Sequence, residues 1–131
     1  MNLKQIHVLL LEDEAAHAEA IRRAVESSDN AFHVQVVGSL REFRDCVNIN
    51  PPDIALLDMV LPDGNGIDLL KSLPQPNAFP MLILTSHGNE KAAVDALKAG
   101  ALDYIVKGLD WDSLLRRLEL HLPKRASAAK C

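Results

Sequence analysis

Short apolar runs alternate along the chain with stretches of helical periodicity. Ile6 to Leu11 is apolar and rich in branched residues, and similar runs occupy 32–38, 53–57, 79–85 and 102–107. Such runs predict buried strands. Between them, apolar side chains recur every three or four residues, which predicts helices over 14–26, 40–49, 67–73, 88–100 and 111–122. Ser39 is expected to cap the second helix, and Gly100 to end the fourth.

Five strands that alternate with five helices indicate an α/β domain with a parallel sheet, because parallel strands need crossover connections. The strands are almost continuously apolar, which is typical of a sheet covered on both faces. The chain has 131 residues, the size of one domain. We therefore expect a single domain over 1–123 and a flexible tail over 124–131. Trp111, which shares its helical spacing with Leu114 and Leu118, is expected to pack in the core.

Composition and charge narrow the function classes. The chain is 48% hydrophobic and 24% charged, as in a globular domain. Its formal net charge is -4 and it has no long run of Lys or Arg, so direct nucleic-acid binding is not expected. The first residues contain neither a signal peptide nor a membrane span, and the two cysteines form no metal motif. A cytoplasmic protein without membrane contact is the expectation.

Polar residues follow four of the five predicted strands. Glu12 and Asp13 follow the first, Asp58 ends the third, Thr85 ends the fourth and Lys107 ends the fifth. Parallel strands bring their carboxyl ends to one edge of a sheet, where doubly wound folds bind ligands. Any one such acid is more often a cap or turn residue. Together they predict a functional site.

The charges at this edge indicate a metal and phosphoryl chemistry. Carboxylates about 6 Å apart repel by roughly 3 kcal/mol per pair at an effective dielectric near 20, so the fold requires a counter-charge. Mg²⁺ prefers carboxylates, waters and phosphate oxygens. Asp13, Asp58 and a backbone carbonyl just after Asp58 could hold the ion, with Glu12 binding metal waters. Asp58 could attack a phosphoryl donor, while Lys107 and Thr85 bind phosphoryl oxygens.

The chain resembles the receiver domain of two-component response regulators from Ile6 to Leu122. The matching motifs, in order, are LLLEDE, PDIALLDMVLPDGNGIDLL, LILTS and ALKAGALDYIVK. The resemblance implies a flavodoxin-like doubly wound (βα)5 fold with a five-stranded parallel sheet in the order 2-1-3-4-5. It also implies reversible phosphorylation of Asp58, and Mg²⁺ or Mn²⁺ bound by Asp13, Asp58 and the Val60 main-chain carbonyl, with Glu12 acting through water.

The resemblance also implies a switch. Thr85 corresponds to the hydroxyl residue drawn toward the phosphoryl group, and Tyr104 to the aromatic residue that turns inward with it, shifting the surface of the fourth helix, fifth strand and fifth helix. Gly108 follows Lys107 where the family usually has proline. His87 is expected to be a surface loop histidine rather than a group that orients water.

The expected partners are a histidine kinase or histidine phosphotransfer protein and an output partner or domain that the sequence does not identify. A homodimer formed on phosphorylation and a place within a hybrid histidine kinase also fit the resemblance. The protein would act mainly as a phosphoacceptor that catalyses its own phosphorylation and slow dephosphorylation.

Three other functions fit the residues of this chain less well. An aspartyl-phosphate phosphatase would need a second acid where Val60 stands. An EF-hand calcium loop would need an acid where Met59 or Leu61 stands. A receiver-like binding module that is not phosphorylated would tend to lack the acids or the lysine, which this chain has.

Overall fold

The computed structural model describes residues 5–28, 31–72, 79–86, 89–108 and 111–122. The large sheet has five strands: β1 (Ile6–Leu11), β2 (Phe32–Val37), β3 (Ile54–Asp58), β6 (Met81–Thr85) and β7 (Asp103–Val106). All its pairings are parallel and its order is β2-β1-β3-β6-β7, which is 2-1-3-4-5 when only these strands are counted. The predicted strand order is confirmed.

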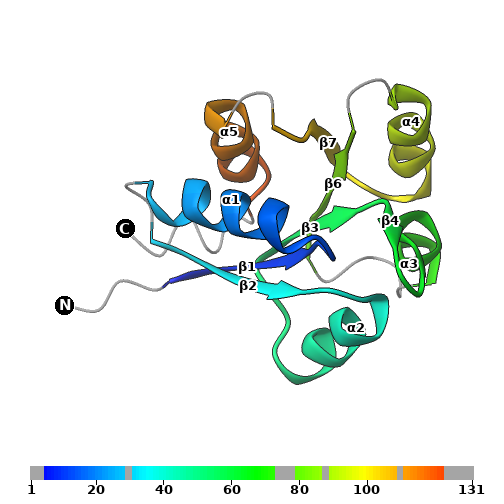
Figure 1. Cartoon of the computed structure of the whole chain (residues 1–131), viewed down its shortest axis with the longest axis horizontal. Helices are drawn as coiled ribbons and strands as arrows, with labels where there is room; N and C mark the ends of the chain where they lie inside the picture. Colours follow the sequence, from blue (N-terminus) through cyan, green and yellow to red (C-terminus); the bar gives the residue numbers. More distant parts are fainter. Residues whose placement is uncertain (1–4, 29–30, 73–78, 87–88, 109–110, 123–131) are drawn as a thin grey trace.

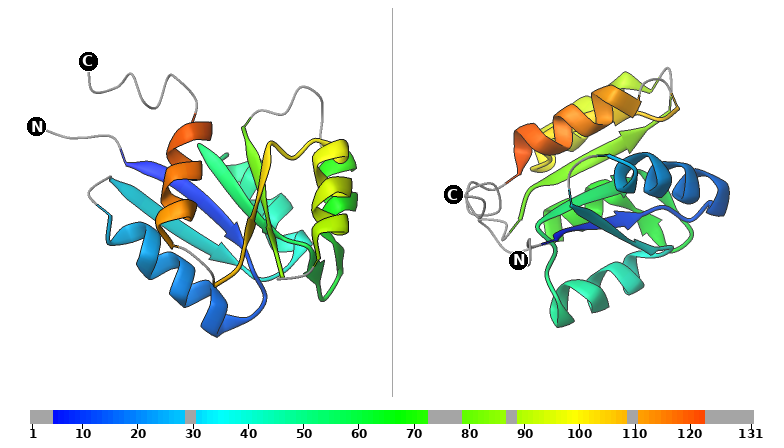
Figure 2. Two further views of the ribbon diagram at one scale, coloured as in Figure 1. Left: turned by 90° about the horizontal axis from the view of Figure 1, so that it is seen from above. Right: turned by 90° about the vertical axis from the view of Figure 1, so that its left-hand side faces the viewer.

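Five helices cover the two faces of this sheet (Figure 1): α1 (Ala15–Glu26), α2 (Leu40–Ile49), α3 (Gly66–Ser72), α4 (Glu90–Ala99) and α5 (Trp111–His121). The helices and the sheet form three layers, and the left view of Figure 2 looks onto the sheet with α5 in front of its strands. The α1 and α5 side buries Ile21, Val25, Leu114 and Leu118 against the sheet, and the opposite side buries Phe43 and Leu69.

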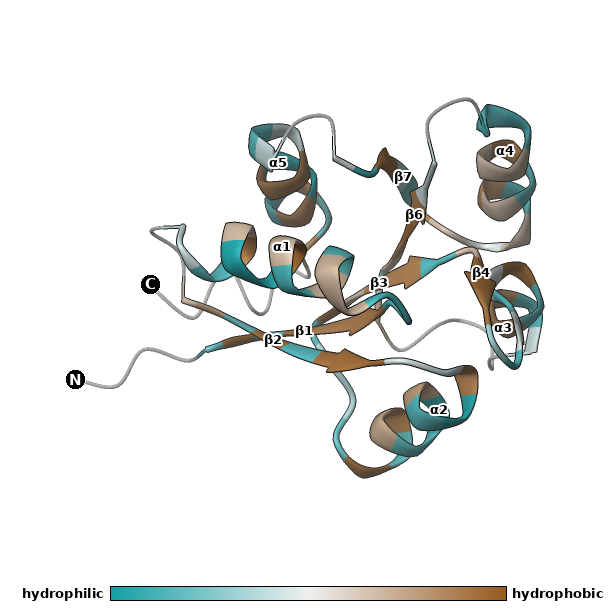
Figure 3. Cartoon of the chain, in the orientation of Figure 1, coloured by the Kyte–Doolittle hydropathy of each residue, from teal (hydrophilic) through white to brown (hydrophobic). Residues whose placement is uncertain are grey.

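The strands form the centre of the core because nearly every residue in them is apolar. Leu9, Leu10 and Leu56 are fully buried, although successive side chains point to opposite faces. Figure 3 shows the same separation of polar and apolar residues. The strands are mostly hydrophobic, and the polar residues of the helices face outward. This is the pattern of a sheet covered on both faces, as the sequence predicted.

The helix ends follow local chemistry. Ser39 Oγ accepts a hydrogen bond from the Glu42 amide at 3.2 Å, so Ser39 is the N-cap of α2 as predicted. Gly100 has φ 124° and is the C-cap of α4, also as predicted. The predicted start of that helix at Gly88, His87 and the predicted tail over 124–131 lie outside the described residues.

One expectation about the helices was wrong, and one pair of short strands was not predicted. Trp111 is 37% exposed rather than packed in the core. Helical spacing fixes the side of α5 on which this side chain lies, but it does not reveal whether another element covers the first turn. The stretch after Asp58, for which no strand was predicted, forms an antiparallel hairpin of β4 (Val60–Leu61) and β5 (Gly64–Asn65).

The hairpin leads directly into α3 through Gly66, whose amide donates to the Met59 carbonyl at 2.9 Å. A Cβ on Gly66 would lie 2.7 Å from the Asp58 carbonyl oxygen and 3.5 Å from Met59 Cα. Both atoms belong to the backbone and cannot move aside as a flexible side chain could. Gly66 therefore permits the close approach of α3 to the end of β3.

We predict that Gly66→Ala destabilises the protein by about 1–3 kcal/mol, the usual cost of overpacking. Urea unfolding measures the effect. Gly38→Ala is the matched control, since its added Cβ would meet its nearest neighbours at 3.6 and 3.9 Å, which is ordinary contact. Equal stability of the two variants would contradict the steric argument.

Candidate functional site

The parallel register brings the polar residues to one edge of the sheet. Leu11 pairs with Leu57, so Glu12 and Asp58 follow side by side at the ends of β1 and β3. Thr85 pairs with Val106, so Lys107 comes next along β7. The Lys107 amide donates to the Thr85 carbonyl at 2.9 Å and extends this pairing past the end of the strand.

Asp58 is a buried carboxylate, with 8% of the residue exposed. Its Oδ1 accepts a hydrogen bond from the Met59 amide at 2.7 Å. Its Oδ2 lies 3.0 Å from Lys107 Nζ. One oxygen is thus oriented by the backbone, and the other faces a cation.

Glu12 lies beside Asp58 and is more deeply buried, at 3% exposed. Its Oε2 accepts from the Glu14 amide at 3.1 Å, and its Oε1 forms an ion pair with Lys107 Nζ at 2.7 Å. Each carboxylate oxygen of Glu12 thus has a partner, a backbone amide for Oε2 and the Lys107 ammonium for Oε1. Burial, helped by the charge of Asp58, raises the pKa of Glu12 even though the Lys107 ammonium and the Glu14 amide oppose that shift.

Lys107 is the cation that Glu12 and Asp58 share. Burial alone would lower the pKa of Lys107, but its contacts with the two carboxylates outweigh burial and the pKa is raised. The ammonium is therefore charged at neutral pH.

The next residue, Gly108, has φ 76°, a left-handed conformation that proline cannot adopt because its ring holds φ near -65°. Glycine in place of the family's usual proline is consistent with the backbone at this position.

Glu12, Asp13 and Asp58 form an acidic cluster in which one ligand atom from each lies within 4.8 Å of the others. Asp13 is the exposed member and opens the cluster to solvent. One ammonium cannot neutralise three carboxylates, so the cluster keeps a net negative charge. Carboxylate oxygens are the ligands that hard divalent cations prefer. The cluster could therefore hold a metal ion.

The remaining predicted site residues lie around this cluster. Thr85 is 2% exposed, and its hydroxyl donates to the carbonyls of Ser86 at 3.4 Å and Asn89 at 3.3 Å. Tyr104 is half-buried in β7 and packs against the core on the α2, α3 and α4 side. Val60 opens the β4–β5 hairpin with its side chain 74% exposed. Their roles, and the Val60 carbonyl as a ligand, stay predictions.

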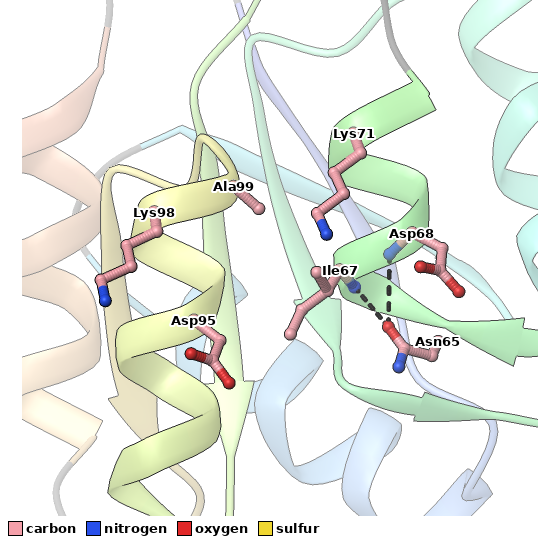
Figure 4. Close-up of a pocket in the computed structure, with 7 residues that line it drawn as sticks. All are labelled: Asn65, Ile67, Asp68, Lys71, Asp95, Lys98 and Ala99. Carbon is pink, nitrogen blue, oxygen red and sulfur yellow. Dashed lines mark hydrogen bonds between the residues drawn. The ribbon is translucent and has the colours of Figure 1, made fainter.

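A groove of about 450 Å³ lies between α3 and α4 (Figure 4). It is lined by Asn65, Ile67, Asp68, Lys71, Asp95, Lys98 and Ala99. Lysines and aspartates are mixed along both helices, so the groove carries no dominant charge. None of its lining residues belongs to the cluster, and the chemistry therefore resides at the sheet edge.

Comparison with known proteins identifies the family. The family model for the response regulator receiver domain matches residues 8–119. The chain belongs to this family. Receiver domains are phosphoacceptors in two-component signalling, and this is the role that membership gives to the chain.

The similar proteins are regulators of which the chain matches a part. The acid tolerance regulatory protein ActR of Rhizobium meliloti is 34% identical over 112 residues, covering 85% of this chain and 57% of ActR. The KDP operon transcriptional regulatory protein KdpE of Escherichia coli is 32% identical, covering 92% of this chain and 53% of KdpE. For the methanogenesis regulatory protein FilR1 of Methanothrix harundinacea, identity is 37%, over 79% of this chain and 24% of FilR1. The chain thus spans less than two thirds of these relatives.

Solved structures agree with the fold. The receiver domain of a LuxO repressor homologue from Vibrio parahaemolyticus superposes with a TM-score of 0.82 at 30% identity, covering 97% of this chain and 96% of that one. A response regulator from Chloroflexus aurantiacus gives a TM-score of 0.82 at 27% identity, covering 89% of this chain and 97% of that one.

In the described part of the chain, no helix has the length and apolar character needed to cross a membrane.

Sequence reasoning missed two polar residues that shape the loop after Asp58. These residues are Asn65 and Asp63. Asn65 Oδ1 caps α3 by accepting from the amides of Ile67 at 2.7 Å and Asp68 at 3.3 Å. An asparagine just before a helix is a recognisable cap signal. Asp63 binds a helix more than twenty residues earlier in the sequence, and no local signal reveals that.

We predict that Lys107→Met lowers the free energy of unfolding by about 1–3 kcal/mol in chelator-treated buffer, because two buried carboxylates lose their cation. Chemical denaturation measures the loss. Lys98→Met serves as control, since Lys98 is exposed and forms no ion pair with a described residue. If both variants match the wild type, Lys107 is not the counter-charge that the buried acids require.

Proposed function

We propose that Asp58 accepts a phosphoryl group from the phosphohistidine of a sensor kinase or histidine phosphotransfer protein. The supporting observation is the position of Asp58, a buried carboxylate at the end of β3, with Lys107 Nζ 3.0 Å from Oδ2 and two further acids beside it. In the transfer, the phosphorus–nitrogen bond of the donor breaks as a phosphorus–oxygen bond to Asp58 forms. The donor imidazole leaves with the electron pair of the broken bond.

The cation expected in this reaction is Mg²⁺, or Mn²⁺ in its place. Asp13, Asp58 and the Val60 main-chain carbonyl would hold it, and Glu12 would act through a bound water. The ion would neutralise charge that develops on the phosphoryl oxygens. Lys107 would pair with one phosphoryl oxygen, and Thr85 would donate a hydrogen bond to another.

The conformational response would begin at Thr85. Its hydroxyl now donates to the carbonyls of Ser86 and Asn89, the latter being the N-cap residue of α4. Donation to a phosphoryl oxygen would remove the link between Thr85 and the start of α4, while the carbonyls of Ser86 and Asn89 would keep their bonds from the Asn89 and Ala93 amides. Tyr104 would turn inward as part of the same change, altering the α4, β7 and α5 surface. That surface would control an output partner or domain, and homodimer formation on phosphorylation is one form of this control.

The residues around Asp58 argue against rapid turnover as a phosphatase. The position two residues after Asp58 is Val60, whose side chain cannot donate a proton to a leaving group. The acyl phosphate would therefore persist long enough to carry a signal, and its slow hydrolysis would reset the switch.

We predict that acetyl phosphate with Mg²⁺ adds one phosphoryl group to the wild-type chain and none to Asp58→Ala. Intact-mass spectrometry measures the increment. Asp53→Ala is a suitable control because Asp53 lies at the opposite end of the sheet, where it accepts from the His7 amide at 2.8 Å. Equal labelling of wild type and Asp58→Ala would remove Asp58 from the proposed role.

We predict that Asp13→Ala weakens Mg²⁺ binding by at least about tenfold, because a direct carboxylate ligand is lost. Isothermal titration calorimetry measures the affinity. Glu14→Ala is the matched control, since Glu14 is an adjacent exposed acid whose side chain does not belong to the acidic cluster. Unchanged affinity in Asp13→Ala would exclude Asp13 as a ligand.

A further inference from the structure

The β4–β5 hairpin is fastened to the start of α2 by Asp63. Asp63 Oδ1 accepts a hydrogen bond from the Leu40 amide at 2.9 Å, and Oδ2 accepts from the Arg41 amide at 3.2 Å. These are the first two residues of α2. The contacts, led by that with Leu40, lower the pKa of Asp63, so the side chain is a carboxylate at neutral pH.

This contact adds to a cap that α2 already has. Ser39 Oγ accepts from the Glu42 amide at 3.2 Å, and Glu42 Oε1 accepts from the Gly38 amide at 3.2 Å. A helix begins with four amides that lack intrahelical partners, and the cap leaves the first two free. Asp63 binds those two, and in doing so it joins α2 to the hairpin.

The hairpin is held against its surroundings at other points too. Leu61 is buried in the core, and Asn65 Oδ1 caps α3 (Figure 4). Gly64, at φ 150°, lies so close to α2 that a Cβ there would be 2.6 Å from Leu40 Cδ1. Asp63 provides the polar attachment of the hairpin tip on the α2 side.

The segment that leads from β2 into α2 lies close to Asp13. A Cβ on Gly38 would be 3.9 Å from Asp13 Cα, and the Glu12 amide donates to the Val37 carbonyl at 3.0 Å. This segment thus adjoins the one that carries Asp13, and the helix that follows it is bonded through Asp63 to the hairpin that carries Val60.

We propose that Asp63 is a positioning residue for the metal site. A main-chain carbonyl has no rotatable side chain, so the Val60 oxygen can only be aimed by the position of the hairpin. The exposed Val60 side chain does little to fix that position. Asp63, in the turn between β4 and β5, does so by anchoring the tip of the hairpin to α2. This inference rests on the proposed function, in which the Val60 carbonyl and Asp13 bind Mg²⁺ together.

The test compares Asp63→Ala, Asp63→Asn and Ser39→Ala in the full chain by Mg²⁺ calorimetry and urea unfolding. Asp63→Ala is expected to weaken Mg²⁺ binding about tenfold, as loss of a group that orients a metal ligand does. Asp63→Asn loses the charge but keeps a side-chain oxygen acceptor, and it is expected to recover most of the affinity. Ser39→Ala removes the helix's own cap, so it is expected to lower stability and leave Mg²⁺ affinity unchanged.

Three outcomes would overturn the inference. Wild-type affinity in Asp63→Ala would show that the attachment does not aim the ligand. Equal loss of Mg²⁺ affinity in Asp63→Ala and Ser39→Ala would show that the effect comes from helix stability. Equal loss of Mg²⁺ affinity in Asp63→Asn and Asp63→Ala would show that it comes from the charge of Asp63. Should Asp63→Ala not fold, Asp63→Ser, which can reach one amide, is expected to show intermediate affinity, and unchanged affinity there counts against the inference.

Failure of the proposed function gives a different result. A wild-type chain that neither binds Mg²⁺ nor accepts a phosphoryl group at Asp58 would overturn that function, and the inference with it. A wild type that does both, with an Asp63→Ala variant that matches it, would overturn the inference alone.

Discussion

The site depends on keeping two carboxylates buried next to each other. Glu12 and Asp58 are 3% and 8% exposed, and both contact the ammonium of Lys107. Without that cation, repulsion between the acids and the loss of their hydration would oppose folding of this edge. Even with it, the third carboxylate of Asp13 leaves the cluster net negative. Lys107 thus neutralises only part of the charge of the cluster, and the remaining carboxylate charge could hold a divalent cation.

The apolar sheet supplies the rigidity that this arrangement requires. The strands that end at the site are buried along their length, and their parallel register sets the spacing of the acids and of Lys107. Helices cover both faces of the sheet, so a strand slipped by one residue would carry each of its side chains into the opposite layer of the core. The register is therefore strongly specified. Chemistry at the edge and packing in the core are therefore consequences of the same strand alignment.

The features predicted from sequence are those with a local or periodic signal. Apolar runs and helical spacing gave the strands, the helices and their alternation, and strand direction placed Glu12, Asp58, Thr85 and Lys107 at one edge. The β4–β5 hairpin was missed because each of its strands has two residues, too short for any periodicity. The role of Asp63 was missed because its partners are 22 and 23 residues away in sequence. The exposure of Trp111 was not predicted because helical spacing gives the side of the helix on which a residue lies, but not whether another element covers that residue.

A chain of contacts leads from the site toward the α5 surface. The Lys107 amide binds the Thr85 carbonyl, which ties the end of β7 to the end of β6. Farther along β7, Arg117 Nη1 on α5 donates to the Tyr104 carbonyl at 2.6 Å and to Asp103 Oδ1 at 2.9 Å, while His121 Nε2 lies 3.1 Å from Asp103 Oδ2. These bonds join α5 to the Tyr104 carbonyl and the Asp103 carboxylate, while the Tyr104 side chain packs on the opposite face of the sheet. In the proposed response, a change at Thr85 would pass to Tyr104 and the start of α4, and any shift of β7 would reach α5 through Arg117 and His121.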